Sequence, residues 1–177
     1  FGFCPSDVPG ALGASAELPR YGLQPMTIAS GVCGLALKKD LEQDDGTVRH
    51  QYTTGFPAPG MLACSFDPDL IFSVGKAIGR EMQEYGVAFC LAPGCALQRT
   101  PFDAVSQESW SEDPVLTGLC ALFFCKGVQT HGAAILRTGT LPRSLDIRLS
   151  SLRDIYALPF EIAASACKAA LLPDSIV

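Results

Sequence analysis

The stretch DPDLIFSVGKAIGREMQEYGVAFCLAP (67–93) decides the fold class, because it predicts one helix followed directly by one strand. Asp67 supplies a capping carboxylate, and Pro68 favours the first turn of a helix. Gly86 predicts the end of this helix. Between the two ends, apolar side chains recur at helical spacing at Ile71, Val74, Ile78 and Met82. The run VAFCLAP (87–93) is short and apolar throughout, which favours a strand buried on both faces.

The same alternation of strands and helices extends along most of the chain. The further predicted elements are a strand at 26–30, a long loop at 38–60, a loop at 94–110, a helix from 111 to about Gly132, a strand at 133–138, and a helix at 149–170 that Pro159 interrupts. This order predicts right-handed βαβ units and a parallel sheet, hence an α/β fold. The predicted strands have no alternating polar face. Helices should therefore cover both faces of the sheet, or one face should be the interior of a barrel.

Length and charge limit the possible architectures and partners. The chain has 177 residues, 48% of them hydrophobic, and a net charge of -5, which excludes a mainly disordered chain. The acidic balance argues against nucleic acid and anionic membrane surfaces as partners. A full (β/α)8 barrel takes about 250 residues and at least about 200. Any barrel in this sequence is therefore expected to be incomplete.

Local composition suggests an irregular lead-in segment, a single domain and a reducing cellular compartment. Residues 1–25 are rich in Gly, Pro and Ala, and we expect an irregular N-terminal lead-in before a domain at 26–177. No secretory signal is recognisable, and the longest apolar run (119–124) is too short to span a membrane. Eight cysteines occur without a C-x-x-C spacing, which favours free thiols in a reducing compartment. We therefore expect a cytoplasmic protein.

Motif searches based on residue chemistry alone find no site. The acidic stretch 40–46 lacks the glycine and final acid of a calcium loop, and no zinc-ligand spacing is present. The glycines at 31 and 34 lack the third glycine and downstream acid of a dinucleotide-binding turn. His50 and His131 are predicted to lie on the surface. We accordingly expect no metal and no cofactor.

Longer strings, by contrast, resemble one known family. The strings are LPRYGLQPMTIASGVCGLAL (18–37), FPAPGMLACSFDPDLIFSVGKAIGREMQEYGV (56–87), LAPGCALQRTPFDAVSQESWSEDP (91–114), GVQTHGAAILRT (127–138) and SLRDIYALPFE (151–161). They resemble, in order and with few gaps, segments of the catalytic barrel in glycoside hydrolase family 3, the β-glucosidases. The resemblance covers about residues 18–165. It implies a partial TIM-barrel-like domain with three to four βα units, and a family activity in hydrolysis of O-glycosyl bonds.

Several sugar-binding positions of the family hold different residues in this sequence. In the motif S-D-G-P-H-G-L-R, the acid that binds the sugar corresponds to Ser30, and the final Arg corresponds to Ala36. In the motif G-R-N-F-E, the sugar-contacting Arg corresponds to Val105 and the Asn to Ser106. The resemblance therefore implies a sugar pocket that has lost charged and amide partners.

The remaining family positions are partly retained. Glu108 matches the Glu of G-R-N-F-E, and without its Arg neighbour we expect a structural hydrogen bond or a surface role for it rather than sugar binding. The Lys-His pair that grips sugar hydroxyls corresponds to Arg137 and Thr138, and Arg137 is expected either to bind a ligand or to form a salt bridge. The family nucleophile is an Asp in a later S-D-W motif, and the acid/base Glu follows it. Neither matches a position before Val177, so we expect no catalytic residue in this sequence.

Two functions remain open from the sequence. The first is a pseudoenzyme, an interaction or binding protein or a remnant, that is catalytically inactive and binds carbohydrate weakly or not at all. The second is one part of a functional β-glucosidase that another chain completes. Open barrel edges also predict a homodimer, unless residues 1–25 cover the sheet and leave a monomer.

Overall fold

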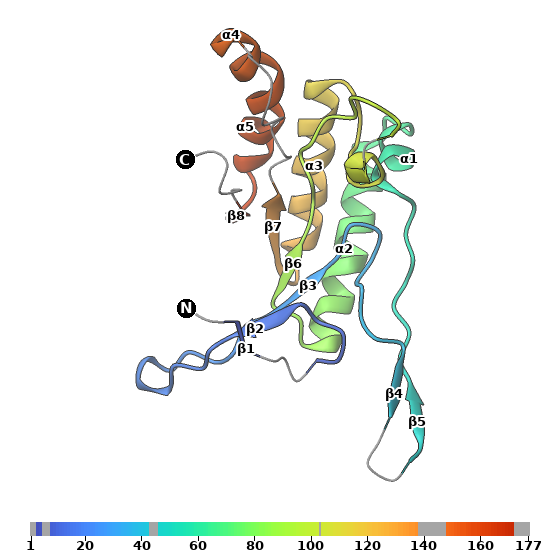
Figure 1. The fold of residues 1–177 in the computed structure, drawn as a ribbon, viewed down its shortest axis with the longest axis vertical. Coiled ribbons are helices and arrows are strands. Elements are labelled where there is room, and N and C mark those ends of the chain that lie inside the picture. The colour runs from blue at the N-terminus through green and yellow to red at the C-terminus, as the bar shows by residue number, and fades with distance from the viewer. Residues whose placement is uncertain (1–2, 5–7, 43–45, 103, 138–147, 172–177) are drawn as a thin grey trace.

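The computed structural model describes residues 3–4, 8–42, 46–102, 104–137 and 148–171. In these ranges the chain forms a six-stranded mixed sheet. The strands, in spatial order, are β1 (Phe3–Cys4), β2 (Gly13–Ser15), β3 (Thr27–Ser30), β6 (Phe89–Leu91), β7 (Ala133–Arg137) and β8 (Ala169–Leu171). Strands β3, β6, β7 and β8 are parallel, whereas β1 and β2 add on in antiparallel orientation (Figure 1). The predicted α/β fold with parallel strands is confirmed, and it matches part of a TIM-like barrel.

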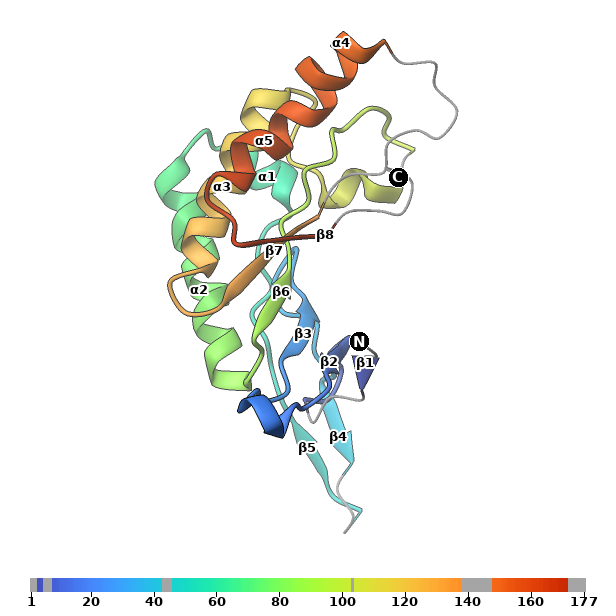
Figure 2. The ribbon, with the colours of Figure 1, turned by 90° about the vertical axis from the view of Figure 1, so that its left-hand side faces the viewer.

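Helices pack along one side of this sheet. The helical segments are η1 (Pro19–Tyr21), α1 (Pro59–Ala63), α2 (Pro68–Tyr85), η2 (Ala104–Glu108), α3 (Pro114–Val128), α4 (Leu149–Ser151), η3 (Leu152–Ala157) and α5 (Leu158–Ala164). Figure 2 shows α2, α3 and α5 on the same side of β3, β6 and β7. A separate hairpin of β4 (Asp40–Glu42) and β5 (Val48–His50) projects away from the sheet (Figure 1).

Helix α2 begins and ends where the sequence predicts. The Asp67 carboxylate accepts hydrogen bonds from the backbone N–H groups of Asp69 (3.0 Å) and Leu70 (3.1 Å), which cap the helix. Gly86 ends it in the left-handed conformation, with a φ of 71°. The four apolar positions at helical spacing are all buried. Capping and periodicity together therefore define both the limits and the inner face of α2.

Helix α3 lies at the centre of the helical layer, between α2 and α5. Its apolar residues surround nearly the whole helix, because both sides contact another helix. Phe124 is 1% exposed and contacts Trp110 edge to face, with ring centroids 5.8 Å apart. Trp110 is itself buried, and its Nε1 donates to the carbonyl of Gly94 (3.1 Å). The core of the domain therefore lies between the helices and the sheet.

The pleat of the strands separates two kinds of residues. Ala29, Cys90 and Ala134 lie side by side on β3, β6 and β7 and are 0% exposed beneath the helices. The adjacent row on the opposite face consists of half-buried residues: Ile28, Phe89 and Ala133. Of the two arrangements left open by the sequence, the described elements fit helices on one face and a barrel interior on the other.

Two segments predicted to be irregular contain short strands. In the lead-in 1–25, β2 pairs with β3, and the backbone N–H of Leu12 donates to the carbonyl of Ile28 (2.9 Å). In the predicted loop 38–60, β4 and β5 form the hairpin, and α1 follows it. These strands have two or three residues each, too few to produce a detectable hydrophobic period. The boundary between the lead-in and the domain stays a prediction.

The predicted helix at 149–170 is shorter and less regular than expected. It comprises α4, a π-helical segment (η3) and α5, and it ends at Ala164. Pro159 does not break it: the proline lies in the first turn of α5, and the turns before it widen to π geometry, consistent with its missing N–H. Strand β8 follows and pairs with β7. Its sequence, Ala-Ala-Leu, has little strand propensity, so the pairing is set by the neighbouring strand. Among the described residues, none of the helices combines the length and the apolar composition that a membrane span requires.

Candidate functional site

The carboxyl ends of the parallel strands bring together several of the residues selected from the sequence. Ser30 is the last residue of β3, and Arg137 is the last residue of β7. By the strand alternation, both belong to the face opposite the helices. Both residues are half-buried. In α/β barrels this end of the strands carries the active site, so it is the candidate site here.

An ion pair between Arg137 and Glu108 is the main polar contact of this end. The Nη1 of Arg137 donates to Oε2 of Glu108 at 2.5 Å, which joins η2 to the end of β7. The Arg137 backbone is also fixed: its N–H donates to the carbonyl of Pro93 (2.9 Å), and its carbonyl accepts from the N–H of Cys95 (2.9 Å). A guanidinium has five N–H donors, more than one carboxylate oxygen requires, so the pair can also bind an oxygen-rich ligand. The salt bridge expected as one alternative for Arg137 is therefore present.

Cys33 is a member of this site that the sequence analysis missed. Burial raises the pKa of the Cys33 thiol, and the negative charge of Glu108 raises it further. The thiol therefore stays protonated beside the carboxylate. Cys33 lies three residues beyond the end of β3, and only this position relative to the strand could have suggested it.

The other selected residues are arranged differently. Ala36 is exposed, and its N–H donates to the carbonyl of Ser30 (2.9 Å), which closes the loop after β3. The Oγ of Ser106 donates to the carbonyl of Thr100 (2.7 Å), so Ser106 stabilises its own loop. This loop borders a shallow groove of about 450 Å³. Val105 belongs to η2, but its side chain is not described, and Thr138 lies outside the described residues.

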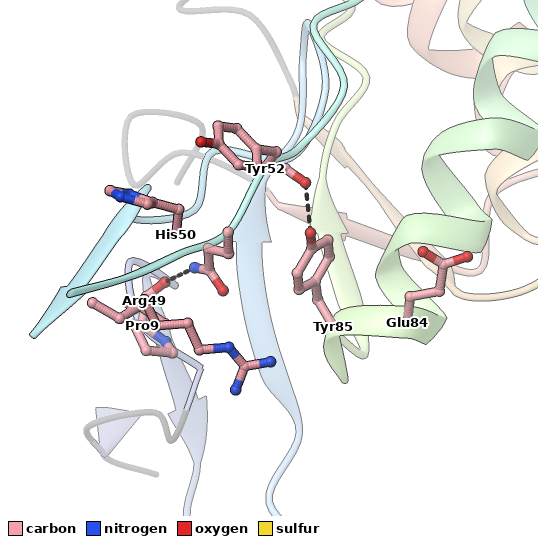
Figure 3. Close-up of a pocket in the computed structure, with 8 residues that line it drawn as sticks. Pro9, Arg49, His50, Tyr52, Glu84 and Tyr85 are labelled. Atoms are coloured by element: carbon pink, nitrogen blue, oxygen red, sulfur yellow. Dashed lines mark hydrogen bonds between the residues drawn. The ribbon is translucent and has the colours of Figure 1, made fainter. Parts of the chain in front are cut away.

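A second hollow lies at the opposite end of the sheet, between the hairpin and the end of α2 (Figure 3). It has a volume of about 670 Å³ and is lined by Pro9, Leu41, Arg49, His50, Gln51, Tyr52, Glu84 and Tyr85. Its hydrogen bonds connect parts of the protein: Tyr85 Oη donates to the carbonyl of Tyr52 (2.5 Å), and Gln51 Nε2 to that of Lys38 (2.5 Å). The amino ends of barrel strands contribute to stability rather than catalysis. We therefore assign this hollow a structural role.

Across the described ranges, no three His, Cys, Asp or Glu side chains are arranged to hold a metal ion. His50 instead forms a contact with Asp40 (Nδ1 to Oδ1, 2.8 Å) on the hairpin.

Parallel strands with helices on one face, and polar side chains at the strand carboxyl ends, define part of a TIM-like barrel. Residues 23–140 match the Glycosyl hydrolase family 3 N terminal domain, which is two thirds of the chain. The chain therefore belongs to glycoside hydrolase family 3. The resemblance described from the sequence is confirmed.

Individual relatives agree with this family assignment. The chain is 31% identical over 160 residues to "Thermostable beta-glucosidase B" of Acetivibrio thermocellus, covering 84% of this chain and 21% of that protein. The structure of beta-glucosidase 3B from Thermotoga neapolitana in complex with alpha-D-glucose superimposes with a TM-score of 0.83 at 36% identity. That match covers 92% of this chain and 24% of the other. A β-glucosidase from Paenibacillus barengoltzii gives a TM-score of 0.76 at 25% identity, covering 92% of this chain and 18% of the other. The chain spans about a fifth of the length of the curated relatives it matches.

Proposed function

We propose that these residues form the first part of a β-glucosidase-type barrel and that they hydrolyse no glycoside unless further strands complete it. The uncovered apolar face of the sheet carries this proposal. Ile28, Phe89 and Ile135 project from three adjacent parallel strands on the side opposite α2, α3 and α5, and within the described residues they are only half-buried. Side chains of this kind fill the interior of a closed barrel. A barrel interior of this type requires strands beyond β8.

The chemistry of the candidate site supports the same proposal. Glycoside hydrolysis needs two carboxyl groups on opposite sides of the scissile bond, about 5 to 10 Å apart. At the carboxyl ends of the strands, Glu108 is paired with Arg137, so its carboxylate is suited to accepting hydrogen bonds from sugar hydroxyls. The nucleophile and the acid would then come from other strands. On its own, this site would bind a sugar with a dissociation constant no lower than millimolar, because few of the sugar hydroxyls would find a hydrogen-bond partner.

A pseudoenzyme is the second candidate function. Ser30 and Ala36 occupy positions at which the family resemblance implies an acid and an arginine. Ala36 is exposed beside the site, and its side chain has no polar group to offer a ligand. A completed barrel with these residues would have lost most of its affinity for the sugar and would serve binding or interaction instead.

One experiment separates the two functions. The 177-residue chain alone should release no product from an aryl β-glucoside above the buffer rate. We would then replace the corresponding segment of a bacterial β-glucosidase with residues 18–171 and assay the chimera. Activity in this chimera supports the partial-enzyme function. A folded but inactive chimera that regains activity with Ser30→Asp and Ala36→Arg supports the pseudoenzyme. Turnover by the 177-residue chain alone would refute both.

We also propose that the isolated chain forms a homodimer in the cytoplasm. On one side β2 pairs with β3, so the parallel edge at β3 is covered by the chain itself. At the other side β8 is the last strand of the described sheet, and Leu171 on it is 50% exposed. An exposed edge beside apolar residues favours association. Light scattering at tens of micromolar checks this, and a mass of 18.7 kDa would contradict it.

A further inference from the structure

One short segment after β6 supports both members of the Glu108–Arg137 pair. At its start, Pro93 and Cys95 each form a backbone hydrogen bond of 2.9 Å with Arg137. Further along the segment, the side chain of Gln98 reaches the backbone around η2 instead. The two members of the pair come from different elements, and this segment is the support that they share.

The side-chain amide of Gln98 binds the backbone on both sides of Glu108. Its Nε2 donates to the carbonyl of Ser109 (2.9 Å) and to the carbonyl of Ser106 (3.3 Å). A primary amide nitrogen has two N–H donors, so these two carbonyls use both of them. Glu108 lies between the two serines, and a single side chain therefore fixes the backbone before and after it.

Two glycines allow close packing around this amide and around Glu108. A methyl group at Gly60 of α1 would lie 3.0 Å from Nε2 of Gln98, and one at Gly94 would lie 3.3 Å from the carbonyl oxygen of Glu108. Helix α1 therefore packs against the amide, and the segment after β6 packs against the backbone of Glu108. Gln98 itself is half-buried, so its amide is held in place by its neighbours.

We propose that Gln98 is the positioning residue that holds Glu108 at Arg137 and so sets the geometry in which this pair receives a ligand. The side chains of Glu108 and Arg137 are 38% and 30% exposed, so solvent weakens their attraction. The ion pair alone therefore fixes Glu108 only weakly, and the hydrogen bonds of Gln98 hold the backbone that carries it. The effect on a ligand rests on the proposed function of the site, whereas the placement of Glu108 does not.

NMR of the arginine side chains in the 177-residue chain tests the placement of Glu108. The guanidinium signals of Arg137 are assigned by their loss in Arg137→Gln, and Glu108→Gln gives their position without the ion pair. Gln98→Glu keeps the shape of the side chain, but an ionised carboxylate cannot donate to a carbonyl. We therefore expect the Arg137 signals of this variant to move to their position in Glu108→Gln.

Two further variants separate the lost donors from the added charge. Gln107→Glu is the matched control, because Gln107 is an exposed residue of η2 beside Glu108 and gains the same charge. It should leave the Arg137 signals in place. Gln98→Met removes both donors without adding a charge, and it should move the signals as Gln98→Glu does.

Two results would overturn the placement of Glu108 by Gln98. The first is an unchanged set of Arg137 signals in a folded Gln98→Met chain. The second is loss of the fold in both Gln98 variants, seen by circular dichroism, since Gln98 would then support the whole domain rather than the pair. If only one of the two variants folds, its Arg137 signals decide.

Kinetics of the active chimera test the effect on a ligand. The pair would hold the sugar equally in the ground state and the transition state, so Gln98→Met should raise KM for an aryl β-glucoside about 5- to 10-fold and change kcat less than about 2-fold. A fall in kcat at constant KM would overturn this effect. If the chimera is inactive both with and without Ser30→Asp and Ala36→Arg, the proposed function fails, and the NMR signals still decide whether Gln98 places Glu108.

Discussion

The two faces of the sheet differ in residue size as well as in burial. Ala29, Cys90 and Ala134 on the covered face are small, and this lets the helices approach the strands closely. The opposite row contains Ile28 and Phe89, which are larger yet less buried. The core on the covered face is therefore complete within the described residues. The open face carries the candidate site, and the described helices do not cover its large apolar side chains.

The largest effect on stability is expected from a cavity in the core on the covered face of the sheet. Phe124→Ala removes from α3 an aromatic ring that is 1% exposed and contacts Trp110. We expect the free energy of unfolding to fall by about 3–5 kcal/mol, because both burial and packing are lost. Urea unfolding followed by circular dichroism measures this.

Phe102→Ala is the control for this substitution. The Phe102 ring is 95% exposed, so its removal should change stability by less than about 0.5 kcal/mol. Equal losses in the two variants would mean that α3 is not the centre of the core.

A slightly smaller effect is expected at the crossing of α2 and α3. A methyl group added at Gly79 would lie 2.6 Å from the carbonyl oxygen of Val128, so Gly79→Ala must push the helices apart. Alanine ordinarily stabilises a helix by about 1 kcal/mol relative to glycine. We expect a net loss of about 1–3 kcal/mol instead, measured by urea unfolding. Gly55→Ala, where no atom lies within 4 Å of the added methyl group, should be nearly neutral.

The covered side was largely predictable from sequence, because its signals are local. Helix α2 carries its own cap, its own period and its own terminal glycine, so its limits needed no tertiary information. Strand β7 was likewise found from a continuous apolar run. Strands β2 and β8 were missed because their conformation depends on pairing with β3 and β7 rather than on their own residues.

The candidate site was predictable only as separate positions. The resemblance selected Glu108 and Arg137, which are 29 residues apart in the sequence, but not their ion pair. For the approach of Cys33 to Glu108, the only sequence signal is the place of Cys33 just after β3. Such contacts depend on how loops return to the sheet, and no local spacing encodes this.

A moderate effect is expected on the open face. Phe89→Ser removes a half-buried ring between Ile28 and Ala133, and we expect unfolding to become easier by about 1–2 kcal/mol. The same change makes the open face more polar, so a dimer formed through it should weaken. Light scattering and urea unfolding of the same variant measure both. A loss as large as that of Phe124→Ala would mean that the open face is as well packed as the covered one.

The smallest effect on stability is expected from the ion pair. The side chains of Arg137 and Glu108 are 30% and 38% exposed, so solvent screens their attraction. Arg137→Gln and Glu108→Gln should each lower the free energy of unfolding by no more than about 1 kcal/mol, and the double variant by less than the sum of the two. The coupling should also shrink at high salt. A coupling above about 3 kcal/mol would place the pair in a dry interior, since only buried pairs lose that much when one partner is removed. With a small coupling, the pair adds little to folding, and its place at the carboxyl ends of the strands is better explained by ligand binding than by stability.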